Sequence, residues 1–198
     1  MTDRGRSADP RAERVRARLR EAAFAMAHER PVDEITVGDL VTRAQVSRQV
    51  FYRHFRDRDD AVNIAFSQAF TQAFADATAH CHADPRTRIT DLFAFAAEHR
   101  AMYRNIVPST VTQHVVRMFR AALLPPCEQI AGQGMAVVST IAPLSVDAVT
   151  RFLVGGLMEV LRSWMEDPDA TDLAARVQAA LDTIDALLSI SPTDRKDS

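Results

Sequence analysis

The sequence predicts an all-α protein in which a small N-terminal three-helix helix-turn-helix bundle is joined to a larger C-terminal helical bundle, with about nine helices in all. Apolar residues recur at three- and four-residue spacings along nearly all of the 198-residue chain. The interruptions fall at Pro, Asp, Ser and Gly, which are typical of helix ends. No segment shows the alternating pattern of a convincing strand, and 47% apolar residues suffice to bury a core.

The first helix is predicted over residues 10–29. Asp9 can cap its first turn, and Pro10 fits the first helical position, where the backbone N–H has no helical partner. Pro31 stops this helix, because proline removes a backbone donor and clashes with the preceding turn.

Two short helices follow, over residues 36–44 and 47–54. Thr36 and Asp39 form a capping-box pattern at the start of the first, and Ser47 can cap the second. Two helices of this size, joined by about three residues, have the dimensions of a helix-turn-helix.

The later helices follow from the same signals. A long helix is expected over residues 57–80, and Asp84-Pro85 begins another. Segment 101–108 is predicted to be broken. Segment 125–143, with two glycines and three prolines, is predicted to be a loop that can hold a short apolar helix. Three more helices are expected at 110–124, 145–166 and 169–190.

Two domains are predicted, residues 1–60 (an N-terminal tail and the helix-turn-helix) and residues 61–198 (the larger helical bundle). The first 60 residues carry thirteen arginines against eleven acidic residues, whereas the remainder carries eleven basic against fifteen acidic residues. This asymmetry is too mild to indicate nucleic-acid binding by itself. The polar ends, 1–9 and 191–198, are expected to be loose tails.

Several classes of protein are disfavoured. Cys81 and Cys127 are too few for a disulfide framework, and no segment resembles a signal peptide or a membrane span, so a cytoplasmic protein without a membrane partner is expected. His80 and His82 flank Cys81, but they would point to nearly opposite sides of a helix, so no metal site is predicted. No phosphate loop, nucleophile elbow or metalloprotease pair is present, and neither enzyme activity nor a cofactor is expected.

The second short helix can present a polar surface while apolar residues anchor it. Val50, Phe51 and Phe55 suit packing against the bundle. Arginine suits guanine and glutamine suits adenine in the major groove, whereas serine, tyrosine and histidine suit phosphate. The residues left for the DNA side are Ser47, Arg48, Gln49, Tyr52, Arg53 and His54.

A resemblance to the tetracycline-repressor (TetR) family of transcription regulators runs from Leu19 to Ala61: LREAAFAMAHERPVDEITVGDLVTRAQVSRQVFYRHFRDRDDA. It rests on several identities at fixed spacing. The resemblance places Arg48 and Gln49 where base edges are usually contacted and Gln45 in the turn of the DNA-binding motif. It further implies sugar-phosphate contacts by Thr36, Ser47, Tyr52, His54 and Arg58.

Four positions depart from the family pattern. Pro31 and Gln45 stand where the family usually has glycine, and a left-handed Gln45 would cost about 1 kcal/mol. Gln49 and Val50 replace the Gly and Thr common there, so Gln49 can add base contacts or hold the backbone further from the groove. The operator sequence of relatives therefore does not transfer to this chain.

The larger domain is rich in aromatic and methionine side chains. Each of them suits an ordinary core, but the resemblance implies that some line an apolar cavity for an inducer, with Tyr103 or His114 as a polar handle. A largely apolar, uncharged or weakly polar small-molecule effector is expected. The predicted effector-binding residues are Phe66, Phe70, Phe95, Met102, Tyr103, His114, Met118 and Trp164.

The last two predicted helices are apolar on more than one side, which would leave a large exposed patch in a monomer. The resemblance implies a homodimer held by a four-helix interface. Two-fold symmetry then favours a palindromic operator in double-stranded DNA, with recognition helices about one helical turn apart. The predicted interface residues are Phe152, Gly155, Gly156, Val160, Leu173, Val177, Leu181 and Ile184.

The sequence thus predicts a DNA-binding transcriptional regulator, in particular a repressor released from a palindromic operator by a small apolar effector. Two alternatives within regulation are an activator and a DNA-binding regulator without small-molecule input. A third, from another class, is a helical ligand-carrier or interaction module with a degenerate DNA domain.

Overall fold

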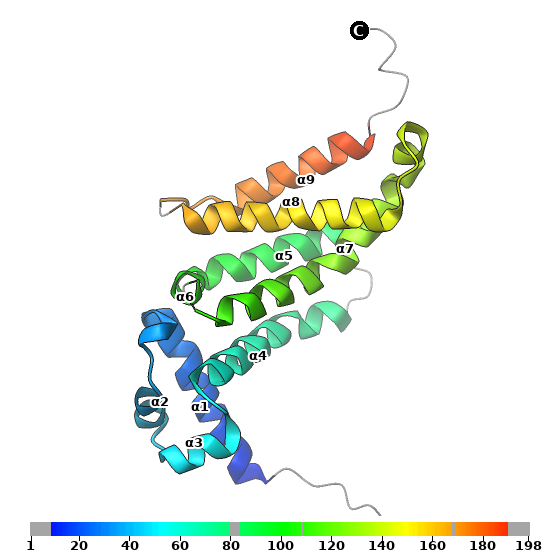
Figure 1. The fold of residues 1–198 in the computed structure, drawn as a ribbon. Helices are drawn as coiled ribbons and strands as arrows, with labels where there is room; N and C mark the ends of the chain where they lie inside the picture. Colours follow the sequence, from blue (N-terminus) through cyan, green and yellow to red (C-terminus); the bar gives the residue numbers. More distant parts are fainter. Residues whose placement is uncertain (1–8, 80–83, 108, 168, 190–198) are drawn as a thin grey trace, which may run out of the picture. The chain divides into compact units, whose positions relative to one another are not determined.

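The computed structural model describes residues 9–79, 84–107, 109–167 and 169–189. Over these ranges the chain folds into α-helices and one short 3-10 helix, with no strand among them (Figure 1). The predicted all-α class is confirmed. The His80–His82 motif lies outside the described residues, as do the two predicted tails apart from Asp9.

Two compact units can be distinguished. The described residues up to Gln72, together with Ala101–Val115, form the first unit. Ala73–Arg100, together with the described residues from Val116 onward, forms the second. The predicted division after residue 60 concerns functional domains and remains a prediction.

The first unit contains the three N-terminal helices that were predicted. Helix α1 packs on α2, and α2 packs on α3. The fully buried Leu19, Leu40 and Phe51, one from each helix, form the centre of this core. The elements that lie wholly or partly in this unit are α1 (Pro10–Glu29), η1 (Val32–Glu34), α2 (Val37–Ala44), α3 (Arg48–His54), α4 (Arg58–Ala79), α6 (Arg100–Ile106) and α7 (Val111–Ile141).

Polar contacts attach the segment 101–115 to the rest of the first unit, and two of them lie near the ends of α1 and α4. The Asn105 side-chain amide donates to the carbonyl of Ala27 at 2.9 Å, at the end of α1. The Thr110 hydroxyl donates to the carboxylate of Asp59 near the start of α4. Burial opposes ionisation of Asp59, but the bonds from Thr110 and Arg58 together hold its pKa below the usual value. The α6–α7 corner is therefore part of the N-terminal core.

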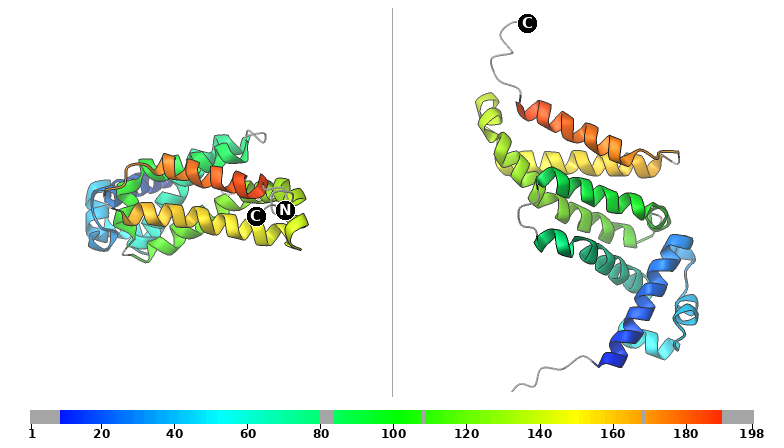
Figure 2. Two further views of the ribbon diagram at one scale, coloured as in Figure 1. Left: turned by 90° about the horizontal axis from the view of Figure 1, so that it is seen from above. Right: turned by 180° about the vertical axis from the view of Figure 1, so that it is seen from behind.

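The second unit is built around α9, which packs on both α5 and α8 (Figure 2). Arg86 of α5 donates to the carbonyl of Leu181 at 3.0 Å. The Arg100 guanidinium lies 4.5 Å from the ring centre of Trp164 and donates to the carbonyl of Asp167 at 2.7 Å. Arg100 therefore holds the end of α8 and the segment that leads to α9. The other helices of this unit are α5 (Pro85–Glu98), α8 (Val146–Glu166) and α9 (Leu173–Ser189).

The loop predicted over residues 125–143 is wrong, because α7 continues to Ile141 with Pro125 and Pro126 inside it. Its buried residues continue through the prolines at helical spacing, and their burial offsets the lost backbone hydrogen bonds. The axis of α7 changes direction in its later part, as expected of a helix that holds prolines (Figure 1). The buried residues are Leu123, Cys127, Ile130 and Ala131.

The segment 101–108 is also more regular than predicted, since α6 occupies Arg100–Ile106. Met102, Tyr103 and Ile106 are buried, at the spacing of one helix face. A helix this short has little intrinsic stability, so its packing into the first unit accounts for its formation.

Candidate nucleic-acid interface

The start of α2 is fixed by a complete capping box. The Asp39 backbone N–H donates to the Thr36 hydroxyl at 3.1 Å, and the Thr36 backbone N–H donates to the Asp39 carboxylate at 2.9 Å. The Thr36 hydroxyl also donates to this carboxylate, at 2.8 Å. These bonds hold the pKa of Asp39 below its usual value, and Arg30 adds an ion pair at 2.9 Å. Thr36 is exposed, but its hydroxyl proton is already committed to Asp39.

The turn between α2 and α3 depends on a left-handed residue. Gln45 has φ 52° and ψ 50° and is the only non-glycine residue with positive φ in the described part of the chain. This conformation allows the Val46 N–H to bond the Val41 carbonyl at 2.9 Å, which satisfies the end of α2. Arg18 of α1 donates to the side-chain oxygen of Gln45 at 3.3 Å. The glycine common at this position in the family is thus replaced by a glutamine with its own polar contact.

Helix α3 starts at the cap that the sequence predicts. The Val50 N–H donates to the Ser47 hydroxyl at 3.3 Å. Phe51 and Phe55 are buried with ring centres 5.6 Å apart, whereas Val50 is only half-buried. The two phenylalanines therefore anchor α3 on the unit, with a smaller contribution from Val50 than predicted.

The opposite side of α3 is polar and open to solvent. Ser47, Arg48 and Gln49 are exposed, and Tyr52 is 59% exposed although it is a large aromatic side chain. His54, at the end of the helix, is half-buried. A short helix with such a side can enter the major groove, where arginine and glutamine contact base edges.

Arg58 lies at the start of α4 and is largely occupied inside the unit. Its guanidinium donates to the carbonyls of Asp33 and Ile35 at 3.0 and 3.3 Å, and to the Asp59 carboxylate at 2.7 Å. Its side chain is 24% exposed. Because Ile35 precedes the cap residue Thr36, Arg58 fixes the entry to α2, a role that sequence reasoning did not identify.

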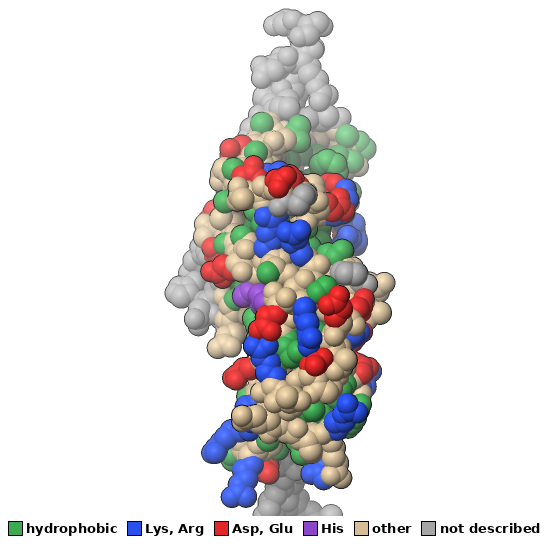
Figure 3. All heavy atoms as spheres, turned by 90° about the vertical axis from the view of Figure 1, so that its left-hand side faces the viewer, with side chains coloured by type: hydrophobic (Ala, Val, Ile, Leu, Met, Phe, Trp, Pro, Cys, Tyr) green, Lys and Arg blue, Asp and Glu red, His purple; other side chains and the backbone are tan. Residues whose placement is uncertain are grey.

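Charge on the face drawn in Figure 3 is mixed. Basic and acidic side chains are interspersed over it (Figure 3). This agrees with the mild excess of arginine in the first 60 residues. An intermixed surface favours DNA binding through a few placed cations rather than a broad basic field.

The predicted effector-binding residues are divided between the two units. Met102 and Tyr103 are buried in the first, where the rings of Phe66 and Tyr103 lie 6.0 Å apart. His114 Nε2 lies 2.7 Å from the Ser67 hydroxyl. Of the full set, Phe66, Phe70, Met102, Tyr103 and His114 belong to the first unit, and Phe95, Met118 and Trp164 belong to the second.

The predicted dimer-interface residues fall into two groups. Those on α8 face solvent, with Phe152 71% exposed, Gly155 and Gly156 exposed and Val160 half-buried. Those on α9 are already buried inside the protomer: Leu173, Val177, Leu181 and Ile184. The exposed side of α9 instead carries small residues at helical spacing, a feature that the sequence analysis missed: Ala175, Ala179, Thr183 and Ala186.

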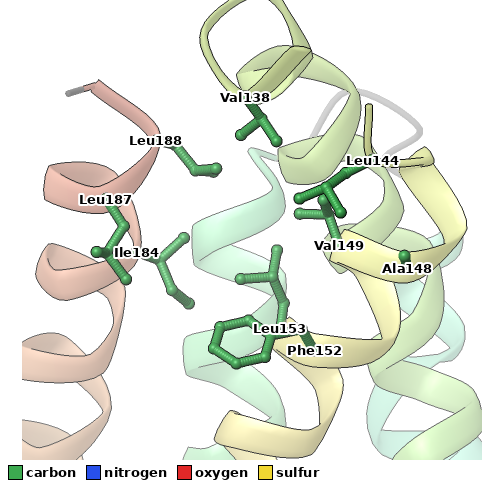
Figure 4. A pocket seen from close by; sticks show the side chains of 9 residues that line it. All are labelled: Val138, Leu144, Ala148, Val149, Phe152, Leu153, Ile184, Leu187 and Leu188. Carbon is green, nitrogen blue, oxygen red and sulfur yellow. The ribbon is translucent and has the colours of Figure 1, made fainter. Parts of the chain in front are cut away.

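An apolar groove lies at one end of the second unit, among α7, α8 and α9 (Figure 4). Its volume is about 400 Å³, and all nine of its lining side chains are apolar. Phe152 and Ile184 were predicted for the dimer interface, whereas none of the nine was predicted for the effector. The other seven are Val138, Leu144, Ala148, Val149, Leu153, Leu187 and Leu188.

The described residues contain no group of three or more His, Cys, Asp or Glu side chains placed to hold a metal ion. Burial raises the pKa of the Cys127 thiol to about 12, so this thiol stays protonated at neutral pH and is a poor nucleophile. Within the same part of the chain, no helix has the length and hydropathy needed to cross a membrane.

Residues 19–62 match the family described as "Bacterial regulatory proteins, tetR family". This range contains the capped α2, the left-handed turn and the solvent-facing polar side of α3. The chain is therefore a DNA-binding transcriptional regulator of the helix-turn-helix class. Its DNA-binding region, residues 19–62, is that of the tetR family of bacterial regulatory proteins.

Solved structures share the fold over nearly the whole chain. The activator of the dihydroxyacetone kinase operon, DhaS, has a TM-score of 0.63 at 13% identity, with 88% of this chain and 96% of that chain covered. The fatty acid degradation regulator FadR from Bacillus halodurans gives 0.62 at 16% identity, with coverages of 86% and 94%. FadR from Bacillus subtilis, in complex with stearoyl-CoA, gives 0.61 at 17% identity, with coverages of 85% and 96%. No curated protein sequence matches the chain.

Proposed function

We propose that the chain is a repressor that binds a palindromic operator as a homodimer and is released by a small apolar effector. The observation that carries the DNA-binding part is the solvent-facing side of α3, where Arg48, Gln49 and Tyr52 project opposite the buried Phe51. A duplex can approach these side chains without any rearrangement of the core. Thr36, Gln45, Ser47, His54 and Arg58 complete the proposed DNA-binding set.

A gel shift with a duplex from the region upstream of the gene tests this surface. Arg48→Ala and Tyr52→Ala should each abolish the specific shift, because each removes a contact from the exposed side of α3. Arg162→Ala on α8, another exposed arginine, is the matched control and should bind like the wild type. Equal binding by all four proteins would count against this surface.

The proposed dimer uses the exposed sides of α8 and α9. Phe152, Gly155 and Gly156 leave an apolar, closely approachable surface on α8, and the small exposed residues of α9 allow another helix to pack against it. Val160 lies at the margin of this surface. The buried Leu173, Val177, Leu181 and Ile184 support it from within. Equilibrium sedimentation at micromolar concentration should give the mass of a dimer, and the mass of a monomer would refute the proposal.

The effector proposal rests on the apolar character of the predicted set, in which Tyr103 and His114 supply the polar groups. A structural relative in complex with stearoyl-CoA binds a ligand with a long apolar acyl chain on a charged CoA group, which supports an apolar chain as part of the effector. The effector must bind the DNA-incompetent state better than the DNA-binding state, because only differential affinity shifts the equilibrium. A panel of apolar compounds, with acyl-CoAs tested beside them, should contain one that both raises the melting temperature and releases the duplex. Retained duplex binding across the panel would contradict this.

Activation is the second candidate, because one structural relative is described as an operon activator. The two candidates differ only in the sign of control. A reporter fused to the upstream region, with and without the gene for this chain, separates them. Higher expression without the regulator indicates repression, and lower expression indicates activation.

A further inference from the structure

Arg48 belongs to α3, but its guanidinium reaches α2. A Cβ built on Gly38 would lie 3.1 Å from Arg48 Nη2 and 3.3 Å from the Thr36 hydroxyl oxygen. Such a distance is tighter than nine in ten real Cβ contacts, so a side chain at position 38 would require the guanidinium to shift by a few tenths of an ångström. The space left by glycine is therefore the space in which Arg48 packs.

The charge of Arg48 is available, unlike that of its neighbours. Arg43 donates twice to Glu29, at 2.5 and 2.6 Å, and Arg30 is paired with Asp39 at 2.9 Å. Arg48 is exposed and makes no ion pair or hydrogen bond to any residue that the structure describes. It is thus a cation held in place by packing, without a carboxylate to neutralise it.

The place of Arg48 also indicates what it contacts. In a helix-turn-helix the first helix crosses the DNA backbone while the second enters the major groove. A guanidinium that lies on α2 is therefore on the backbone side of the interface. Arginine suits this position because its donors match phosphate oxygens.

We propose that Gly38 is a positioning residue that seats Arg48 on α2, so that the Arg48 guanidinium contacts a DNA phosphate. This inference rests on the proposed DNA-binding surface. It reassigns Arg48 from the base edges to the backbone and leaves Gln49 as the base-contacting residue of the pair. A contact to phosphate operates on any sequence, so the test needs no knowledge of the operator.

The test is a double-mutant cycle in the full-length protein. Fluorescence anisotropy measures Kd for a mixed-sequence duplex of about 30 base pairs at low salt, where phosphate contacts dominate. Arg48→Ala should weaken binding roughly tenfold for each of the two protomers in the proposed dimer, because each loses one charge-assisted hydrogen bond. Gly38→Ala should weaken binding by a smaller factor in the wild type, because the guanidinium must shift, and by nothing further in the Arg48→Ala background.

The melting temperature and the salt dependence of Kd distinguish a positioning role of Gly38 from a role in folding. Gly38→Ala should leave the melting temperature unchanged or raise it, because alanine favours a helix more than glycine does. Arg48→Ala should lower the slope of log Kd against log salt concentration by about two, as expected for one lost phosphate contact in each protomer of the proposed dimer, and Gly38→Ala should lower it by less. An unchanged slope in Arg48→Ala would overturn the phosphate assignment.

Binding by the wild type and by the two variants distinguishes an incorrect role for Gly38 from an incorrect DNA-binding surface. If the wild type binds, Arg48→Ala weakens binding and Gly38→Ala binds like the wild type, the seat on α2 is refuted while DNA binding stands. If the wild type does not bind the mixed-sequence duplex at low salt, the DNA-binding surface itself is refuted.

Discussion

Helices α3 and α8 each bury one side in their own unit, but their exposed sides are chemically opposite. The exposed side of α3 holds Arg48, Gln49 and Tyr52, whose polar groups are hydrated when no DNA is bound. The exposed side of α8 holds Phe152, 71% open to water, beside two glycines. A polar side suits a ligand that is present only part of the time, whereas an apolar side is costly in water until another apolar surface covers it. This contrast supports reversible DNA binding by α3 and a lasting interface through α8.

The contrast between α3 and α8 requires that α3 itself has a buried side and an exposed side that contribute differently to stability. Phe51→Ala should lower the free energy of unfolding by about 3–5 kcal/mol, because it removes a fully buried ring. Tyr52→Ala, at the adjacent and exposed position, should change it by less than about 0.5 kcal/mol. Denaturant titration followed by circular dichroism measures both. Similar losses in the two variants would mean that Tyr52 belongs to the core.

A charged substitution on the exposed side of α8 tests whether this side forms the dimer interface. Phe152→Arg should weaken the dimer by about 3 kcal/mol, because the symmetric interface receives the change twice and each copy loses a buried ring. Sedimentation equilibrium over a concentration series gives the dimer Kd. Arg151→Ala, at the neighbouring exposed position, serves as the control. An unchanged dimer Kd in Phe152→Arg would remove Phe152 from the interface.

Arg58 and Arg48 both belong to the first unit, but they differ in their contacts. The guanidinium of Arg58 is bonded to the protein, whereas that of Arg48 is exposed. Arg58→Ala should lower the free energy of unfolding by about 1.5–3 kcal/mol, because it leaves the carbonyls of Asp33 and Ile35 without their donor. Arg53→Ala, an exposed arginine of α3, should cost less than about 0.5 kcal/mol. Thermal unfolding of both variants checks this. Equal stability of the two would show that Arg58 is not needed to fix the start of α2.

The smallest expected effect concerns the turn. Gln45→Gly should raise the free energy of unfolding by about 1 kcal/mol, because glycine adopts the left-handed conformation without strain. Gln45→Ala should not stabilise the protein, since alanine retains that strain and loses the contact with Arg18. Denaturant midpoints of the two variants make the comparison. A lower midpoint for Gln45→Gly would mean that the Arg18 contact outweighs the backbone strain.

Local signals predicted the DNA-binding unit well. The caps Thr36 and Ser47 each depend on side chains within three residues, so the sequence contains the whole interaction. The sequence left the conformation of Gln45 open, because glutamine stands where the family usually has glycine, and a left-handed residue or a turn of another shape could follow. The contacts from Arg18 to Gln45 and from Arg48 to Gly38 join separate helices, and no sequence pattern indicated them.

The second unit was less predictable, because helical periodicity shows which residues share a side but not which surface covers it. Leu173, Val177 and Leu181 were assigned to a dimer interface, yet they are buried within the protomer. Pro125 and Pro126 indicated a loop, but burial of the surrounding apolar residues keeps α7 helical through them. In both cases tertiary packing decided between local alternatives.

The most direct test of the central claim is selection of bound sequences from a randomised duplex by the full-length protein. The exposed side of α3 and a two-fold dimer predict an enriched inverted repeat with half-sites about one helical turn apart. Tyr52→Ala should abolish the enrichment, while Arg162→Ala should yield the same repeat. Failure of the wild type to enrich any sequence, or a repeat that persists in Tyr52→Ala, would contradict recognition through this side of α3.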